Sequence, residues 1–217
     1  MSASETGFSP VEARVLTHEW RMWRDDATQL TSVLQPGYWF HIGKDFDHTS
    51  FENNLNAHAY FAYDKPNNEL SLLLISEQDD RDLKAGKNND PYIYQAIYER
   101  PGLQLPLNKE IAWQMINKWN NEYETYCEDR THSVLGFALT NIVPLPYLLP
   151  ELAKGQDMYV YLGLRPAPVP DAEALSLLFY NNNSGNFVHL KSQAKPEDFS
   201  SPVPPFGQGD PGKFGLL

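Results

Sequence analysis

Residues 57–76 read AHAYFAYDKPNNELSLLLIS, and this stretch decides the expected fold. Two runs rich in strand-favouring residues flank the turn-forming sequence Lys65-Pro66-Asn67-Asn68, which is typical of a β-hairpin. The second run is almost continuously apolar from Leu70 to Ile75. A strand with one face in water would alternate apolar and polar residues. We therefore expect this strand to lie inside a sheet, covered on both faces.

A long amphipathic helix is expected before the hairpin. Ser9 can cap its first turn, Pro10 suits the first helical position, and Glu12 completes a capping box. Pro36-Gly37 ends the helical pattern, and the poor helix formers Asp25-Asp26 allow a break within it. The apolar residues recur at helical spacing and form one stripe: Ala13, Leu16, Trp20, Trp23, Ala27, Leu30 and Leu34.

The rest of the chain predicts a second helix and more strands. The helix is expected from Asn108 to about Glu128, with a stripe formed by Ala112, Ile116, Trp119, Tyr123 and Tyr126. The charged segment 77–91 is expected to be a solvated loop. Further strands are expected at 38–42, 92–98, 133–140, 158–164, 174–180 and 186–191, with a short helical turn at 147–154.

The two halves of the chain show the same predicted order of helix, strand, hairpin and strand. A shift of 96 residues places the first helical stripe on the second, and a shift of 98 places Phe61 on Tyr159. A shift of 105 aligns two Leu-Ser-Leu-Leu segments, at 70–73 and 175–178. An internal duplication would explain this order. The alternative is chance, because any two amphipathic helices can be slid into register.

These patterns predict an α+β fold, with a mainly antiparallel sheet, two long amphipathic helices on one face, and a possible internal duplication. The expected organisation is an N-terminal extension over 1–8, a single domain over 9–195 and a Pro/Gly-rich tail over 196–217; the pseudo-repeats would span 9–101 and 105–195. The tail has five prolines and four glycines, so it cannot be regular structure and is either disordered or an extended arm. A groove between the two halves would be the natural binding surface.

Composition limits the classes of partner. The 217 residues are 41% hydrophobic and 13% aromatic, which is enough for a packed core. Lys and Arg number 17 against 28 Asp and Glu, and a net charge of −11 would repel nucleic acid. No run approaches the roughly 20 apolar residues of a membrane helix, and residues 1–8 lack the features of a signal peptide. We expect an acidic, soluble, cytoplasmic protein that binds neither nucleic acid nor membrane; the single cysteine, Cys127, fits a reducing compartment.

The candidate binding residues lie in one loop and on one helix. His41, Asp45, Asp47 and His48 are ligand-type residues that would converge if the loop from Gly43 folded back. Their spacing matches no ligand motif, so we assign no metal, no cofactor and no catalytic residue. Trp113 falls off the second helical stripe, and an exposed tryptophan there would be an interface anchor.

The expected function is non-catalytic binding of another protein, as in assembly, chaperone-like or immunity-type proteins. The sequence does not decide whether the chain forms a homo-oligomer. One alternative is a metal-dependent enzyme or small-ligand binder that uses the His41–His48 loop. Another is an aromatic-lined pocket for a small ligand between the two halves. Near the end of the second helix, Cys127 is expected to be structural rather than nucleophilic, because helix carbonyls disfavour a thiolate.

Overall fold

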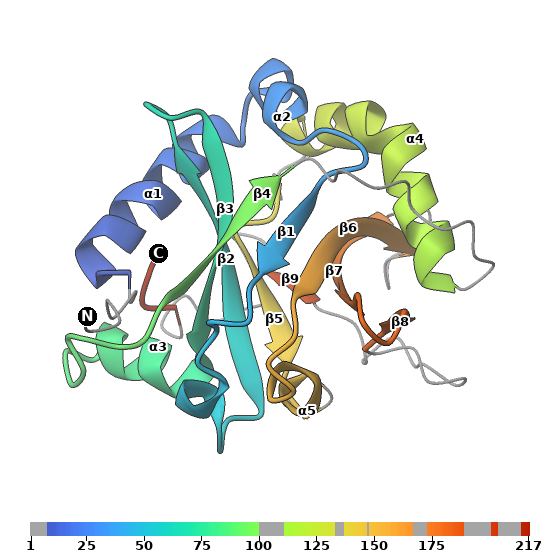
Figure 1. Cartoon of the computed structure of the whole chain (residues 1–217). Coiled ribbons are helices and arrows are strands. Elements are labelled where there is room, and N and C mark those ends of the chain that lie inside the picture. The colour runs from blue at the N-terminus through green and yellow to red at the C-terminus, as the bar shows by residue number, and fades with distance from the viewer. Residues whose placement is uncertain are drawn as a thin grey trace.

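The fold is described from a computed structural model of the chain, shown in Figure 1. The structure describes residues 8–99, 111–132, 137–146, 148–166, 173–188, 201–203 and 214–217. Within these ranges the chain forms five α-helices, one short 3-10 helix (η1) and nine strands. The predictions made for residues 1–7, for Asn108 and for 189–195 lie outside the described residues. No helix in the described ranges has the length and apolar character needed to cross a bilayer.

One curled antiparallel sheet contains all nine strands, in the order β8-β7-β6-β1-β4-β3-β2-β5-β9. Its combination with helices confirms the α+β prediction. The strands are β1 (Trp39–Ile42), β2 (Asn56–Asp64), β3 (Glu69–Ser76), β4 (Tyr94–Glu99), β5 (Thr140–Pro144), β6 (Met158–Pro166), β7 (Glu173–Asn181), β8 (Asn186–Phe187) and β9 (Ser201–Val203).

The hairpin that decided the expected fold is formed by β2 and β3. The two strands pair over eight residues, from Ala57 opposite Ser76 to Asp64 opposite Glu69. Asn68 has a φ of 53° at the turn, a conformation that asparagine tolerates better than most residues. β3 lies between β2 and β4 and is buried from Leu70 to Ser76, as its continuous apolar sequence predicts.

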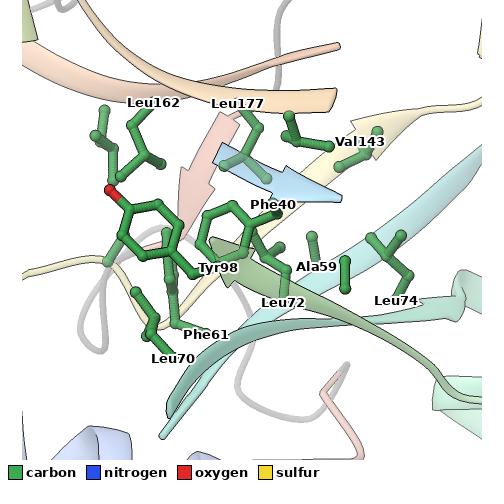
Figure 2. Close-up of a cluster of buried hydrophobic side chains, with 14 of the residues drawn as sticks. Phe40, Ala59, Phe61, Leu70, Leu72, Leu74, Tyr98, Val143, Leu162 and Leu177 are labelled. Carbon is green, nitrogen blue, oxygen red and sulfur yellow. The ribbon is translucent and has the colours of Figure 1, made fainter. Parts of the chain in front are cut away.

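The inner face of the curled sheet holds the main core. Because side chains alternate between the two faces of a strand, every second residue points inward. Figure 2 shows these side chains converging, with Phe40 of β1 near the centre. The labelled residues of this cluster are Phe40, Ala59, Phe61, Leu70, Leu72, Leu74, Tyr98, Val143, Leu162 and Leu177.

The first helix begins where its capping residue predicts. Ser9 accepts a hydrogen bond from the Glu12 amide at the start of α1 (Pro10–Trp23). Asp26 caps α2 (Ala27–Val33), so the helix expected over 9–34 is interrupted at the two aspartates. The remaining helices are α3 (Glu77–Lys84), α4 (Ile111–Thr131) and α5 (Leu149–Leu152).

The outer face of the sheet is covered in two places. Over β2 and β3, α1, α3 and the last residues of the chain form the α1–α3 cluster: Ala13, Tyr60, Ala62, Leu73, Ile75, Leu83, Ile93, Phe214 and Leu216. Over β6 and β7, α4 forms the α4 cluster: Trp39, Ala112, Trp113, Met115, Ile116, Tyr161, Leu178 and Phe187. Figure 1 shows α1 and α4 on opposite sides of the sheet's centre.

Three local predictions are wrong. The segment 77–91 was expected to be a loop, but its first part is helix α3, which is capped by Ser76. Of the strand expected at 133–140, residues 133–136 lie outside the described residues, residues 137–139 are not in a strand, and β5 begins at Thr140. The tail over 196–217 was expected to lack regular structure, yet Ser201–Val203 pairs with β5 as strand β9.

The sheet does not separate into two four-stranded layers. β1, from the first half, pairs with β6, and β5, from the second half, pairs with β2. The 98-residue shift, which places Phe61 on Tyr159, does not match equivalent positions in the two hairpins. Phe61 points into the core, whereas Tyr159 lies on the outer face. Phe61 pairs with Leu72 as Leu162 pairs with Leu177. The order of elements agrees with a duplication, and the duplication itself stays a prediction.

Candidate functional site

The middle of the outer sheet face carries a strip of partly exposed residues. It lies between the α1–α3 cluster and the α4 cluster, and in Figure 1 no described helix passes in front of β1 and β4. Strand alternation and register bring its side chains to one face. We call this surface the open strip and define it by Gln95, Ile97 and Glu99 of β4, His41 of β1, Asp157, and Tyr159 of β6.

His41 is at the centre of the open strip, held between two carboxylates. Its Nε2 atom lies 3.2 Å from Asp157 Oδ1, and its Nδ1 atom lies 3.6 Å from Glu99 Oε1. The imidazole packs beside the Tyr159 ring, with 5.4 Å between the ring centroids. The side chain is 35% exposed, so it is positioned by its neighbours and still reaches solvent.

The open strip also has an apolar side. Ile97 is directly opposite His41 in the β1–β4 pairing and is 42% exposed. Beside it, the Trp39 ring is buried against Tyr159, and its Nε1 atom donates to Glu99 Oε1 over 3.4 Å. The strip therefore places an exposed aliphatic side chain next to two acidic groups that contact His41.

Tyr159 remains a neutral phenol in this surrounding. Partial burial raises the pKa of its hydroxyl, and the nearby carboxylates of Asp157 and Glu99 raise the pKa further. A neutral phenol can both donate and accept a hydrogen bond. The strip thus offers carboxylates, a phenol, an imidazole and an aliphatic side chain to a binding partner.

The four loop candidates do not converge as expected. The two acidic partners of His41 approach opposite ring nitrogens, so they cannot share one ion with the imidazole. Asp45 lies instead beside the Tyr94 hydroxyl, at 3.5 Å. Across the ranges that the structure describes, no group of three or more His, Cys, Asp or Glu could hold a metal ion.

Asp47 and His48 belong to a local cap. Asp47 precedes the 3-10 helix η1 (His48–Phe51) and accepts hydrogen bonds from the Thr49 amide, at 3.0 Å, and from the Ser50 hydroxyl, at 2.8 Å. The hydrogen bonds from Thr49 and Ser50 lower the pKa of the Asp47 carboxyl. Asp47 thus stabilises the turn that the chain makes before β2.

Trp113 is a core residue and not an exposed anchor. It is 2% exposed in the α4 cluster, where its ring meets Phe187 edge-on at 5.0 Å. The apolar stripe expected for this helix included only one face. The first turns of α4 are buried on two sides, so residues beside the stripe are buried as well. The interpretation of Trp113 as a binding residue is therefore corrected.

A second polar cluster was missed by the sequence analysis. Asp80 of α3 is fully buried, and its Oδ2 atom accepts a hydrogen bond from Tyr60 and lies 2.6 Å from His58 Nδ1. Burial and the adjacent Asp80 raise the pKa of the Tyr60 hydroxyl well above its ordinary value. The sequence signal for α3 was present in Ser76 and Asp79, which form a capping pair.

Comparison with protein-family models, with curated proteins and with solved structures finds no match.

Proposed function

We propose that this protein binds another protein through the open strip. The observation that carries the proposal is the exposed Ile97 beside two positioned carboxylates, on the part of the outer sheet face that no described helix covers. Apolar surface with a polar rim marks protein-binding sites, and we infer that Ile97 lies at the centre of such a surface. Because β1 and β6 belong to different halves of the chain, the strip also lies where the two halves meet.

The proposed partner presents lysine or arginine beside an apolar side chain. Glu99 and Asp157 have side chains that are 48% and 49% exposed, and the six residues of the strip include no lysine or arginine. The net charge of −11 would add long-range attraction for a basic surface and would speed the encounter. The same charge supports a partner that is not nucleic acid.

The proposed role is non-catalytic, in the class of assembly, chaperone-like or immunity-type proteins, and its proposed location is the cytoplasm. Cys127 supports this location, since it is a free, buried thiol. A second copy of the chain is a weaker candidate for the partner, because the strip would meet its own negative charge across a twofold axis.

A paired charge reversal tests the proposal. The strip variant is Glu99→Lys/Asp157→Lys, and the control is Glu52→Lys/Asp129→Lys, which changes the net charge equally at exposed positions elsewhere. Immobilised wild type and both variants are incubated with extract of the source cells, and the retained proteins are identified by mass spectrometry. We expect wild type and control to retain the same protein and the strip variant to lose it. Equal retention by all three would contradict the proposal.

A further inference from the structure

The last four residues of the chain occupy a built site between α1 and α3. Figure 1 shows the C-terminal end of the chain between these two helices. Phe214 and Leu216 are 3% and 1% exposed, whereas Leu217 is 42% exposed. The alternating burial shows that two side chains of the segment enter the protein while the final one points away.

The apolar part of the site is the α1–α3 cluster. The Phe214 ring packs on the His58 imidazole, with 4.8 Å between centroids, and meets the Tyr60 ring edge-on at 6.2 Å. Leu216 is buried in the same cluster, which also contains Ala13 of α1 and Leu83 of α3. Burying these two apolar side chains favours the bound position of the segment.

The polar part of the site binds the backbone of the segment. The Gly215 amide donates to Asp80 Oδ1 over 3.0 Å, and the Gly215 carbonyl accepts from Arg14 Nε over 3.1 Å. The Thr17 hydroxyl donates to the Leu216 carbonyl over 2.8 Å. These groups come from α1 and α3, so they bind the backbone of the segment from two sides.

The site selects glycine at its centre. A Cβ atom on Gly215 would lie 2.4 Å from the Asp80 carbonyl oxygen and 3.2 Å from the Lys84 amide nitrogen. Both of these atoms belong to the backbone of α3 and cannot move aside as a flexible side chain would. Any residue other than glycine would therefore push the segment away from Asp80.

Asp80 is held in place by groups other than the tail. Its Oδ2 atom is bound by Tyr60 and contacted by His58, both of β2, which leaves Oδ1 directed at the Gly215 amide. A fully buried carboxylate that is oriented in this way is a prepared acceptor for a peptide amide.

We propose that the surface between α1 and α3 is a peptide-binding site specific for Phe-Gly-Leu, and that the chain's own C-terminus fills it reversibly. Residues 204–213, which precede the segment, include three prolines and three glycines. Because the segment belongs to the same chain as the site, its binding is intramolecular, so the site is self-occupied even when the peptide alone binds weakly. This proposal is independent of the open strip.

A labelled peptide tests the proposal on the full chain. The probe is a fluorescent peptide with the sequence PGKFGLL, residues 211–217, and the variant Gly215→Ala weakens the tail's own occupancy. In fluorescence anisotropy we expect the variant to bind the probe at least ten-fold more tightly than wild type. An unlabelled PGKFGLL peptide should compete, and PGKFALL should not. A folded variant that fails to bind the probe, or that binds no better than wild type, would overturn the proposal.

A second measurement covers the case in which Gly215→Ala does not fold. A specific protease site is inserted within residues 204–213 of the otherwise unchanged chain, and the tail is cut after folding. We expect the cut fragment to stay with the protein in gel filtration, to be displaced by excess PGKFGLL, and to resist displacement by PGKFALL. Equal displacement by both peptides, or immediate loss of the fragment with no rebinding of the probe, would overturn the proposal.

Discussion

Trp113 and Ile111 differ by two positions on the same helix, and their surroundings are opposite. Trp113 is enclosed by aromatic rings of the α4 cluster, whereas Ile111 is 58% exposed. The sequence indicated Trp113 as a surface residue because the predicted stripe assumed one packed face. In the structure the N-terminal turns of α4 contact the outer sheet face, while Trp119 and Tyr126 reach the inner core.

This contrast predicts that Trp113→Ala lowers the free energy of unfolding by about 3–5 kcal/mol, because a large ring leaves a cavity among packed neighbours. Ile111→Ala is the matched control and should change stability by no more than about 0.5 kcal/mol. Both values come from urea or guanidinium unfolding monitored by circular dichroism. Similar losses in the two variants would show that Trp113 is not a core residue.

Cys127 gives a prediction at the same scale. Burial raises the pKa of its thiol to about 12, with Glu124 and Glu128 adding to the shift. The folded state therefore keeps the proton, and the stability linked to this thiol is present below about pH 9 and is lost as the pH rises towards 12. We expect iodoacetamide to leave native Cys127 unmodified at pH 9 and to modify it fully in denaturant. Rapid native modification, read by mass spectrometry, would contradict this burial.

Among the elements, α3 places a buried carboxylate, Asp80, against the backbone of Gly215. It carries Asp80 into the α1–α3 cluster, and its first turn depends on Ser76, whose hydroxyl accepts from the Asp79 amide over 3.1 Å and donates to the Asp79 carboxylate over 2.9 Å. The charged sequence after Ser76 resembles a solvated loop by composition alone. Only the capping pair and Leu83 indicate a helix with one buried face.

Loss of this cap should destabilise α3. Ser76→Ala is expected to cost about 1 kcal/mol of stability and to raise hydrogen exchange within residues 77–84, since the helix loses its first-turn acceptor. Ser32→Ala, at an exposed position within α2, is the control. Unchanged exchange in α3 after Ser76→Ala would show that the cap does not hold this helix.

Several elements could be predicted from their own local sequence. The hairpin of β2 and β3 follows from two apolar runs around a turn sequence, and the start of α1 follows from Ser9 and Pro10. Strand β9 and the burial of Phe214 were not predictable in the same way. Proline and glycine disfavour regular structure locally, and the tail gains its order from distant partners such as Asp80 and β5.

At the scale of the whole molecule, the sequence patterns did not predict which strands of the first half pair with strands of the second half. Nothing in β1 indicates that it pairs with β6, because that choice depends on contacts between residues more than 100 positions apart. The candidate site shows the same limit. The sequence pattern predicted loop residues as the neighbours of His41, but its actual neighbours are Glu99 of β4 and Asp157, which directly precedes β6.

Site-specific photo-crosslinking tests the central claim most directly. A photoreactive p-benzoylphenylalanine replaces Ile97 in the open strip or, as a control, Val11, which is 72% exposed on α1. Both proteins are irradiated in the cells that produce them, and the adducts are identified by mass spectrometry. We predict that position 97 crosslinks to one distinct protein and that position 11 does not. No adduct at position 97, or the same adducts at both positions, would contradict a binding role for the open strip.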